Sequence, residues 1–383
     1  MNGRVDLTRT RWHAPGEGSD CPVDRLLDAA EATVSVGLRQ LCCRLGTDAR
    51  SFARGARNLR EAAQVTVGED LFRRVVEGEG KAVLAASADG DERLGLDWSA
   101  TQCKATTPAG AEVSRVYASA DGVLVPTTTA AEKRKRRATA LAKRRKMGRE
   151  RRRRLPRLRA VRRGSDQRYK QVYVTALYDQ SKGKRLVGVT REGPEGLAKV
   201  LKRDAARVRL RAAVERVGLV DGAACLRKHL EGLPLEKVVL DFRHLAEHVN
   251  DASRRTLGDG TEAGKAFSDR VLHAARHGGY DPLWEELVTW RSGLRGKKRE
   301  EADRLLNYVA ERREMVAYDT CEQRGWDVGT GPMESMCGVT TDRLKGRGRR
   351  WDLDNAEGMM ALEALHQSNL WDAYWANVLA GLN

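Results

Sequence analysis

Three carboxylates in this chain stand where folding could bring them together. Asp121 and Asp221 each precede a glycine beside an apolar run, and Glu334 lies in the first turn of a helix that Pro332 can open. The dipole of such a helix favours an ionised carboxylate near its start. Three converging carboxylates supply hard oxygen ligands for two Mg²⁺ ions about 3.5–4 Å apart, an arrangement that clamps the attacking and leaving oxygens of a phosphodiester.

Each of these acids also has a plainer interpretation. Asp-Gly between apolar runs is a common hairpin turn, and the Glu334 helix taken alone is consistent with a capped surface helix. Two ligand assignments stay open. Asp241 ends an apolar strand as Asp221 does and is an alternative second ligand, and Asp97 is an alternative to Asp121.

Residues 244–248 match a motif for a different chemistry, zinc binding. His244, Glu247 and His248 spell H-x-x-E-H, a zinc-protease motif that places both histidines on one face of a helix. A zinc protease is therefore the rival class of enzyme. It explains neither the charge distribution nor the segment Gly329–Glu334, and a histidine on a helix is more often a structural residue.

The positive charge of the chain is concentrated in one segment. The formal net charge is +17, and residues 133–163 hold 18 of the 70 Lys and Arg but one of the 53 acidic residues, so the remainder is balanced at 52 of each. A second, shorter basic strip follows Glu334 and ends at Trp351. Such local charge indicates a polyanionic partner. A protein that binds DNA without cleaving it, with purely structural acids, is a third possible class.

The remaining composition indicates an intracellular, soluble protein. No window is apolar enough to span a membrane, and the first residues lack the apolar core of a signal peptide. The seven cysteines form no CxxC pair, which suits a reducing compartment.

The elements that would position the acids follow from periodicity. Residues 22–88 are predicted to be helical, and 51–63 and 68–86 have the proportions of a helix-turn-helix. Period-two patterns predict strands over 115–126, 169–178 and 184–189. The basic segment between the first two strands is predicted to be a loop ordered on nucleic acid.

The second half continues with alternating elements. We predict a helix over 197–217, a strand over 219–221, a helix over 223–230 and a strand over 238–241. A helical block over 244–323 and a last helix over 355–379 complete the chain. This order predicts an α/β (α+β) fold with an RNase H-like mixed sheet, an all-helical insertion before the last catalytic helix, and an N-terminal helical region. In that fold the first and fourth strands are neighbours, so Asp121 and Asp221 would meet.

The chain resembles the DDE transposases of bacterial insertion sequences, specifically the ISKra type, over nearly its whole length. The resemblance is carried by an ordered set of short motifs, none of which is specific alone: 121–126, Glu132-Lys133 with Arg136-Arg137, 177–180, 220–223, 240–244 with 247–249, 329–334, 343–348, 350–352, Trp371 and Tyr374-Trp375. Two positions depart from the family pattern, since Cys225 and Arg243 stand where aromatic residues are usual.

The resemblance implies roles for individual residues. Asp121, Asp221 and Glu334 would be the DDE triad and the ligands of two Mg²⁺ ions, for which Mn²⁺ can substitute. Asp241 and His244 would be an accessory Asp-x-x-His pair. The expected DNA-binding residues are Arg136, Arg137, Lys143, Arg144, Arg145, Arg151, Arg152, Arg153, Arg154, Arg343, Lys345, Arg347 and Arg350.

The resemblance also implies partners, a location in the bacterial cytoplasm in association with the nucleoid, and a domain organisation. The partners would be double-stranded DNA, as terminal inverted repeats and target, and further copies of the chain in a dimer or larger assembly. The expected parts are an N-terminal helical region over 1–110, the first part of the catalytic core over 111–242, the helical insertion over 243–325, and the closing helices over 326–383.

Overall fold

The computed structural model describes residues 10–21, 34–89, 94–150, 158, 160 and 163–381. The chain forms two compact units, each assembled from separate segments. The first consists of Met1–Leu96, Val123–Val172 and Gly338–Asn383, and the second of Asp97–Gly122 and Tyr173–Cys337.

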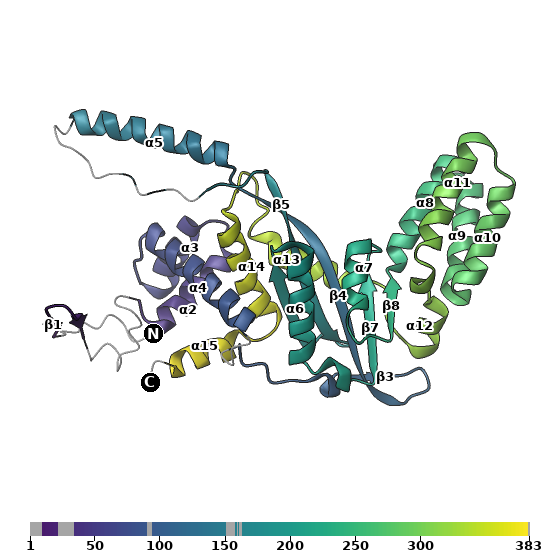
Figure 1. The fold of residues 1–383 in the computed structure, drawn as a ribbon, viewed down its shortest axis with the longest axis horizontal. Coiled ribbons are helices and arrows are strands. Elements are labelled where there is room, and N and C mark those ends of the chain that lie inside the picture. The colour runs from purple at the N-terminus through teal and green to yellow at the C-terminus, as the bar shows by residue number, and fades with distance from the viewer. Residues whose placement is uncertain are drawn as a thin grey trace. The chain divides into compact units, whose positions relative to one another are not determined.

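A mixed sheet organises the second unit (Figure 1). Its strands lie in the order β6-β5-β4-β7-β8, and β3 pairs with the beginning of β4. β7 is parallel to β4 and to β8, while β5 and β6 are antiparallel. This is the predicted α/β RNase H-like arrangement, so the expected fold class is confirmed. The strand bounds are β3 Lys104–Thr106, β4 Glu112–Pro126, β5 Tyr169–Asp179, β6 Arg185–Thr190, β7 Glu215–Val220 and β8 Lys237–Leu240.

The central strands read as continuous apolar runs because both of their faces are covered. Val116, Val217, Leu219 and Val239 are all fully buried. Asp121 lies inside β4, so the hairpin turn that Asp-Gly signals in other sequences is not formed here.

Helices α6 (Gly193–Arg207) and α7 (Ala224–Glu231) make the crossovers from β6 to β7 and from β7 to β8. The predicted helix over 197–217 is wrong in its second half. Arg209 has φ 53°, a left-handed conformation that ends α6, and β7 already begins at Glu215. Glu215 and Arg115 form a buried ion pair at 2.6 Å, and the charge of Glu215 hid the start of the strand in the polarity pattern.

The expected helical block over 244–323 is confirmed as a set of antiparallel helices that lie side by side in Figure 1. Short turns such as Gly258–Thr261 separate them. Their bounds are α8 Phe242–Leu257, α9 Glu262–Gly278, α10 Tyr280–Ser292, α11 Gly296–Ala310 and α12 Tyr318–Arg324.

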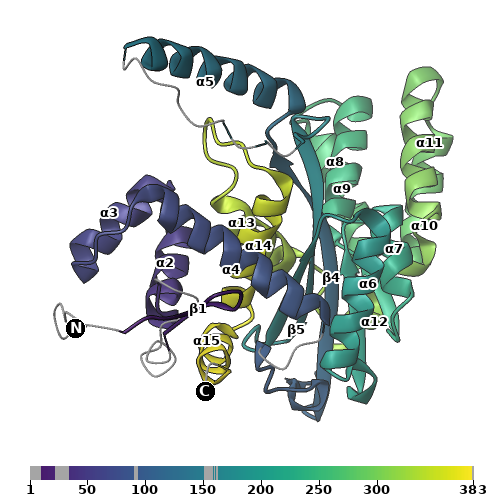
Figure 2. The same cartoon turned by 60° about the vertical axis from the view of Figure 1, so that its left-hand side comes forward.

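The first unit is mainly helical, with a short hairpin of β1 (Trp12–Ala14) and β2 (Gly18–Asp20). Its most extensive helix packing joins α4 to α14 (Figure 2). The predicted last helix is two helices, because Asn369 has φ 57° and breaks it. The bounds are α2 Val36–Asp48, α3 Phe52–Ala63, α4 Glu69–Asp89, α14 Leu353–Gln367 and α15 Trp371–Ala380.

The basic segment is not the predicted loop over its described part, because Ala130–Glu150 forms the helix α5. Thr129 and Glu132 open it with reciprocal bonds between side chain and backbone, at 3.2 and 3.1 Å. Alanine, lysine and arginine are strong helix formers, and this propensity outweighs the repulsion between the charges. In the ranges given above, no helix is long and apolar enough to cross a membrane.

Candidate active site

The register of the parallel strands aligns three acids at one edge of the sheet. Ser119 of β4 pairs with Leu219 of β7, and Val220 pairs with Leu240 of β8. Continued past these pairs, the register sets Asp121, Asp221 and Asp241 level with one another. All three belong to the second unit.

Asp121 and Asp221 are electrostatically coupled. Burial raises the pKa of Asp121 above its ordinary value, and the charge of Asp221 adds to that rise, while the bond from the Gly122 N–H opposes it. That bond to Asp121 Oδ1 is 2.6 Å long, and Ala223 N–H donates to Asp221 Oδ1 at 2.9 Å. Two half-buried carboxylates that repel one another make a site that a cation would stabilise.

Only glycine fits the position after Asp221. Gly222 has φ +90°, and a Cβ there would stand 2.7 Å from Leu240 Cδ1. Its carbonyl accepts from Arg312 Nε at 3.0 Å and Nη2 at 2.9 Å, and the Arg312 guanidinium lies 4.0 Å from the centre of the Tyr308 ring. The helical block therefore holds the turn that carries Asp221.

Asp241 is engaged as a helix cap. Its Oδ1 accepts from the N–H groups of Arg243 at 2.6 Å and His244 at 3.1 Å, and its Oδ2 accepts from the N–H of Thr330 at 2.5 Å and from the Thr330 hydroxyl. Burial alone would raise the pKa of Asp241, but these bonds outweigh it and hold the pKa below its ordinary value. One buried carboxylate thus joins the start of α8 to the segment that leads into Glu334.

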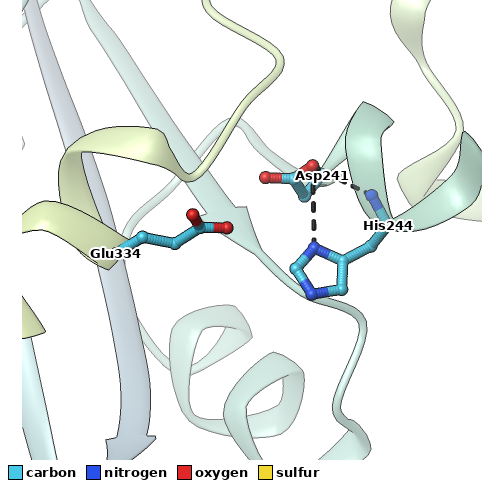
Figure 3. Close-up of side chains that lie close together, drawn as sticks. All are labelled: Asp241, His244 and Glu334. Atoms are coloured by element: carbon cyan, nitrogen blue, oxygen red, sulfur yellow. Dashed lines mark hydrogen bonds and ion pairs between the residues drawn. The ribbon is translucent and has the colours of Figure 1, made fainter. Parts of the chain in front are cut away.

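Glu334 enters from α13 (Gly331–Asp342), which begins where the proline predicts. Its carboxylate points towards Asp241 and His244 (Figure 3), and one ligand atom from each of the three lies within 4.8 Å of the others. His244 Nδ1 is buried without a hydrogen-bond partner, 3.7 Å from Asp241 Oδ1. Among the described residues, Asp241, His244 and Glu334 are the cluster that could hold a metal ion. Of these, Glu334 alone belongs to the predicted triad.

Arg243 is a cation beside Glu334, and the sequence patterns predicted no role for it. Its Nη1 lies 3.5 Å from Glu334 Oε2, and its Nε lies 3.5 Å from Glu247 Oε1. The side chain is 72% exposed. Its departure from the pattern of the family that the chain resembles was a signal in the sequence, whereas Arg312 gave none.

The alternative assignments fare differently. Asp97 is exposed and lies in an irregular segment. Six residues further along the chain, the Cys103 carbonyl accepts from the N–H of Arg115, which precedes Asp121 by six residues in β4. Of the H-x-x-E-H histidines, His248 stacks on Tyr308 with ring centres 3.8 Å apart and is not in the metal-type group with His244.

The donor set fits a hard divalent cation. Carboxylate oxygens are the ligands that Mg²⁺ prefers, and Asp121 and Asp221 are adjacent and mutually repulsive. Glu334, with a 44% exposed side chain, is reachable from solvent. Asp241 fits less well as a ligand, because both of its oxygens already accept two hydrogen bonds. The Nδ1 atom of His244, which has no hydrogen-bond partner, is a further candidate metal ligand.

The predicted DNA-binding residues lie in the first unit, and several stand on α5. Arg136, Lys143 and Arg145 are exposed there, and Arg137 and Arg144 are half-buried. Arg151, Arg152, Arg153 and Arg154 fall outside the described residues.

The basic residues that follow α13 differ in their exposure and in their partners. Lys345 and Arg347 are exposed, and Arg350 pairs with Glu132 at 3.2 Å. Arg343 is buried between Phe52 and Trp351, and burial lowers its pKa to about 10. Arg343 is thus a core residue of the first unit.

Comparison with known proteins adds little. No family model matches the sequence, and the curated proteins yield no match. Among solved structures, the fold is similar to a Drosophila P element transposase strand transfer complex, with a TM-score of 0.41 and 9% sequence identity, over 91% of this chain and 96% of that one.

Proposed function

We propose that this protein is a metal-dependent DNA transposase of the DDE type, similar to those of ISKra insertion sequences. It would bind the ends of its element, cleave the DNA strands and join the 3′ ends to target DNA. The observation that carries the proposal is the register that sets Asp121 and Asp221 level on neighbouring parallel strands of an RNase H-like sheet, with Glu334 entering from α13.

In this proposal each acid has one task. Asp121, Asp221 and Glu334 hold two Mg²⁺ ions, which supply an activated water and charge stabilisation at the leaving oxygen when bound. Asp241 fixes Thr330 and the start of α8, so that Glu334 is held at the correct place. His244 either adds a ligand beside Glu334 or orients the DNA there. Asp221 is preferred to Asp241 as second ligand because Asp241 is already occupied by four donors.

The DNA would be held by the basic residues of α5 and by Lys345 and Arg347. We retain the proposed partners, the ends of the element and target DNA, and an assembly of two or more copies. The expected division into an N-terminal region, a catalytic core, a helical insertion and closing helices is likewise retained as a proposal.

The test uses the full chain and a plasmid that carries the DNA flanking its gene on both sides. With Mg²⁺ or Mn²⁺, the wild type should nick that DNA at the element ends, and Asp121→Ala, Asp221→Ala and Glu334→Ala should not. All three variants should still bind the DNA. Binding without nicking by the wild type would leave a DNA-binding protein with structural acids, and normal nicking by all three variants would place the catalytic residues elsewhere. Zinc bound at about one ion per chain, with loss of activity in His248→Ala, would favour the protease.

A further inference from the structure

The cation beside Glu334 is placed in a way that the proposed function does not use. Arg243 stands in the first turn of α8, where the helix dipole disfavours positive charge. Its guanidinium lies between two carboxylates, 3.5 Å from Glu334 and 3.5 Å from Glu247. Both ion pairs are longer than the roughly 2.7–2.9 Å of a charge-assisted hydrogen bond, so the guanidinium is shared between the two carboxylates.

We infer that Arg243 and a divalent metal compete for Glu334, and that metal binding releases the guanidinium to the scissile phosphate. The inference rests on the proposed function. A metal on Glu334 would place two positive groups within a few ångströms of each other, which is unfavourable even in a solvated site. Because the Arg243 side chain is 72% exposed, its head can leave Glu334 without opening the core.

The released guanidinium has a suitable ligand in the proposed reaction. Its planar fork matches two oxygens of a phosphodiester. The backbone N–H of Arg243 remains bonded to Asp241 at 2.6 Å, so the head would swing from a fixed base. Arg243 therefore acts as a substitute cation before metal arrives and as a phosphate ligand afterwards.

The first measurement needs no catalysis. Mn²⁺ binding to the full chain without DNA is followed by calorimetry for the wild type, Arg243→Gln and the control Arg254→Gln. Arg254 lies on the same helix, is 54% exposed and pairs with Asp251, so its replacement changes the net charge equally. Arg243→Gln should bind Mn²⁺ about three- to tenfold more tightly than either other protein. The gain should shrink at high salt.

The second measurement is single-turnover nicking at saturating metal and DNA. Arg243→Gln should be slower by roughly ten- to a hundredfold, since a donor to the phosphate is removed, and Arg254→Gln should match the wild type. Arg243→Lys keeps the charge and should retain the weaker metal binding of the wild type, which keeps the test valid if the glutamine variant does not fold.

The outcomes separate the two ideas. Equal Mn²⁺ affinity in Arg243→Gln and Arg254→Gln would overturn the competition, and wild-type nicking by Arg243→Gln would overturn the phosphate role. If the wild type nicks no DNA, the proposed function fails, yet the Mn²⁺ isotherms still decide whether Arg243 competes for Glu334.

Discussion

Asp121 and Asp241 lie at the same edge of the sheet, but their surroundings shift their pKa values in opposite directions. Asp121 accepts from Gly122 beside a second carboxylate, and burial raises its pKa. Asp241 receives four donors, which lower its pKa. In the metal-free protein, the ionised carboxylate of Asp121 should therefore lower the stability of the fold, and that of Asp241 should raise it. Such a contrast is expected where one acid is a ligand and the other a structural support.

Asp121→Asn should stabilise the metal-free protein at pH 7. A carboxyl whose pKa is raised by folding costs stability as the pH rises from its ordinary value through the raised one. We expect the melting temperature in EDTA to rise by about 1–3 °C at pH 7, and the gain to shrink as the pH is lowered towards 4. Scanning fluorimetry measures both. A loss of stability at pH 7 in EDTA would contradict the raised pKa of Asp121.

Asp241→Asn should have the opposite effect. The stability that a carboxyl with a lowered pKa contributes is present above its ordinary value and is lost as the pH falls through the folded value. An amide in its place would turn an N–H₂ towards N–H donors, at a cost of about 2–4 kcal/mol. Urea denaturation at pH 7 measures this, with Thr330→Val, which removes one of the four bonds, as the milder control. Unchanged stability of Asp241→Asn would refute its role as a cap.

At the scale of elements, α4 and α14 approach closely at a pair of glycines, Gly80 and Gly358. A Cβ on Gly80 would lie 2.5 Å from the carbonyl oxygen of Gly358, and backbone cannot yield as a side chain does. Gly80→Ala should therefore lower the free energy of unfolding by about 1–3 kcal/mol. Gly78, on the same helix, has nothing within 4 Å, so Gly78→Ala should be neutral or stabilising by up to about 1 kcal/mol. Equal effects of the two substitutions would contradict this packing.

Helix α5 is expected to bind DNA through phosphates. Replacing Lys143, Arg145 and Lys146, all exposed, with alanine should weaken binding to every sequence. The slope of log affinity against log salt should become shallower by up to about 0.9 for each phosphate that is no longer neutralised. The preferred end sequence should not change, because phosphate contacts position DNA and base contacts specify it. An unchanged slope in fluorescence anisotropy titrations would show that α5 does not bind phosphates.

For the whole molecule, the sequence predicted the order of elements better than their bounds. Alternating apolar residues predicted β4, β5 and β6, and the acids in or just after strands predicted a candidate site that remains a proposal. The pattern of polar and apolar residues gave wrong predictions where a charged residue is buried and where a highly charged segment is a helix. Glu215 is 1% exposed inside a strand, and the charge of α5 concealed a helix.

Long-range interactions of the site had no signal in the sequence. The bond from Arg312 to the Gly222 carbonyl joins residues 90 positions apart, and the cap of Asp241 on Thr330 spans 89. Such pairs depend on the packing of the helical block against the sheet edge, which local patterns do not specify.

The most direct test of the central claim replaces proposed metal ligands with a softer one. Asp121→Cys and Asp221→Cys should lose nicking with Mg²⁺ and regain part of it with Mn²⁺, because a thiolate suits Mn²⁺ better than Mg²⁺. Asp241→Cys should not be rescued, since its oxygens cap α8 and hold Thr330. Rescue of Asp241→Cys but not of Asp221→Cys would move the second ligand to Asp241 and contradict the proposed site.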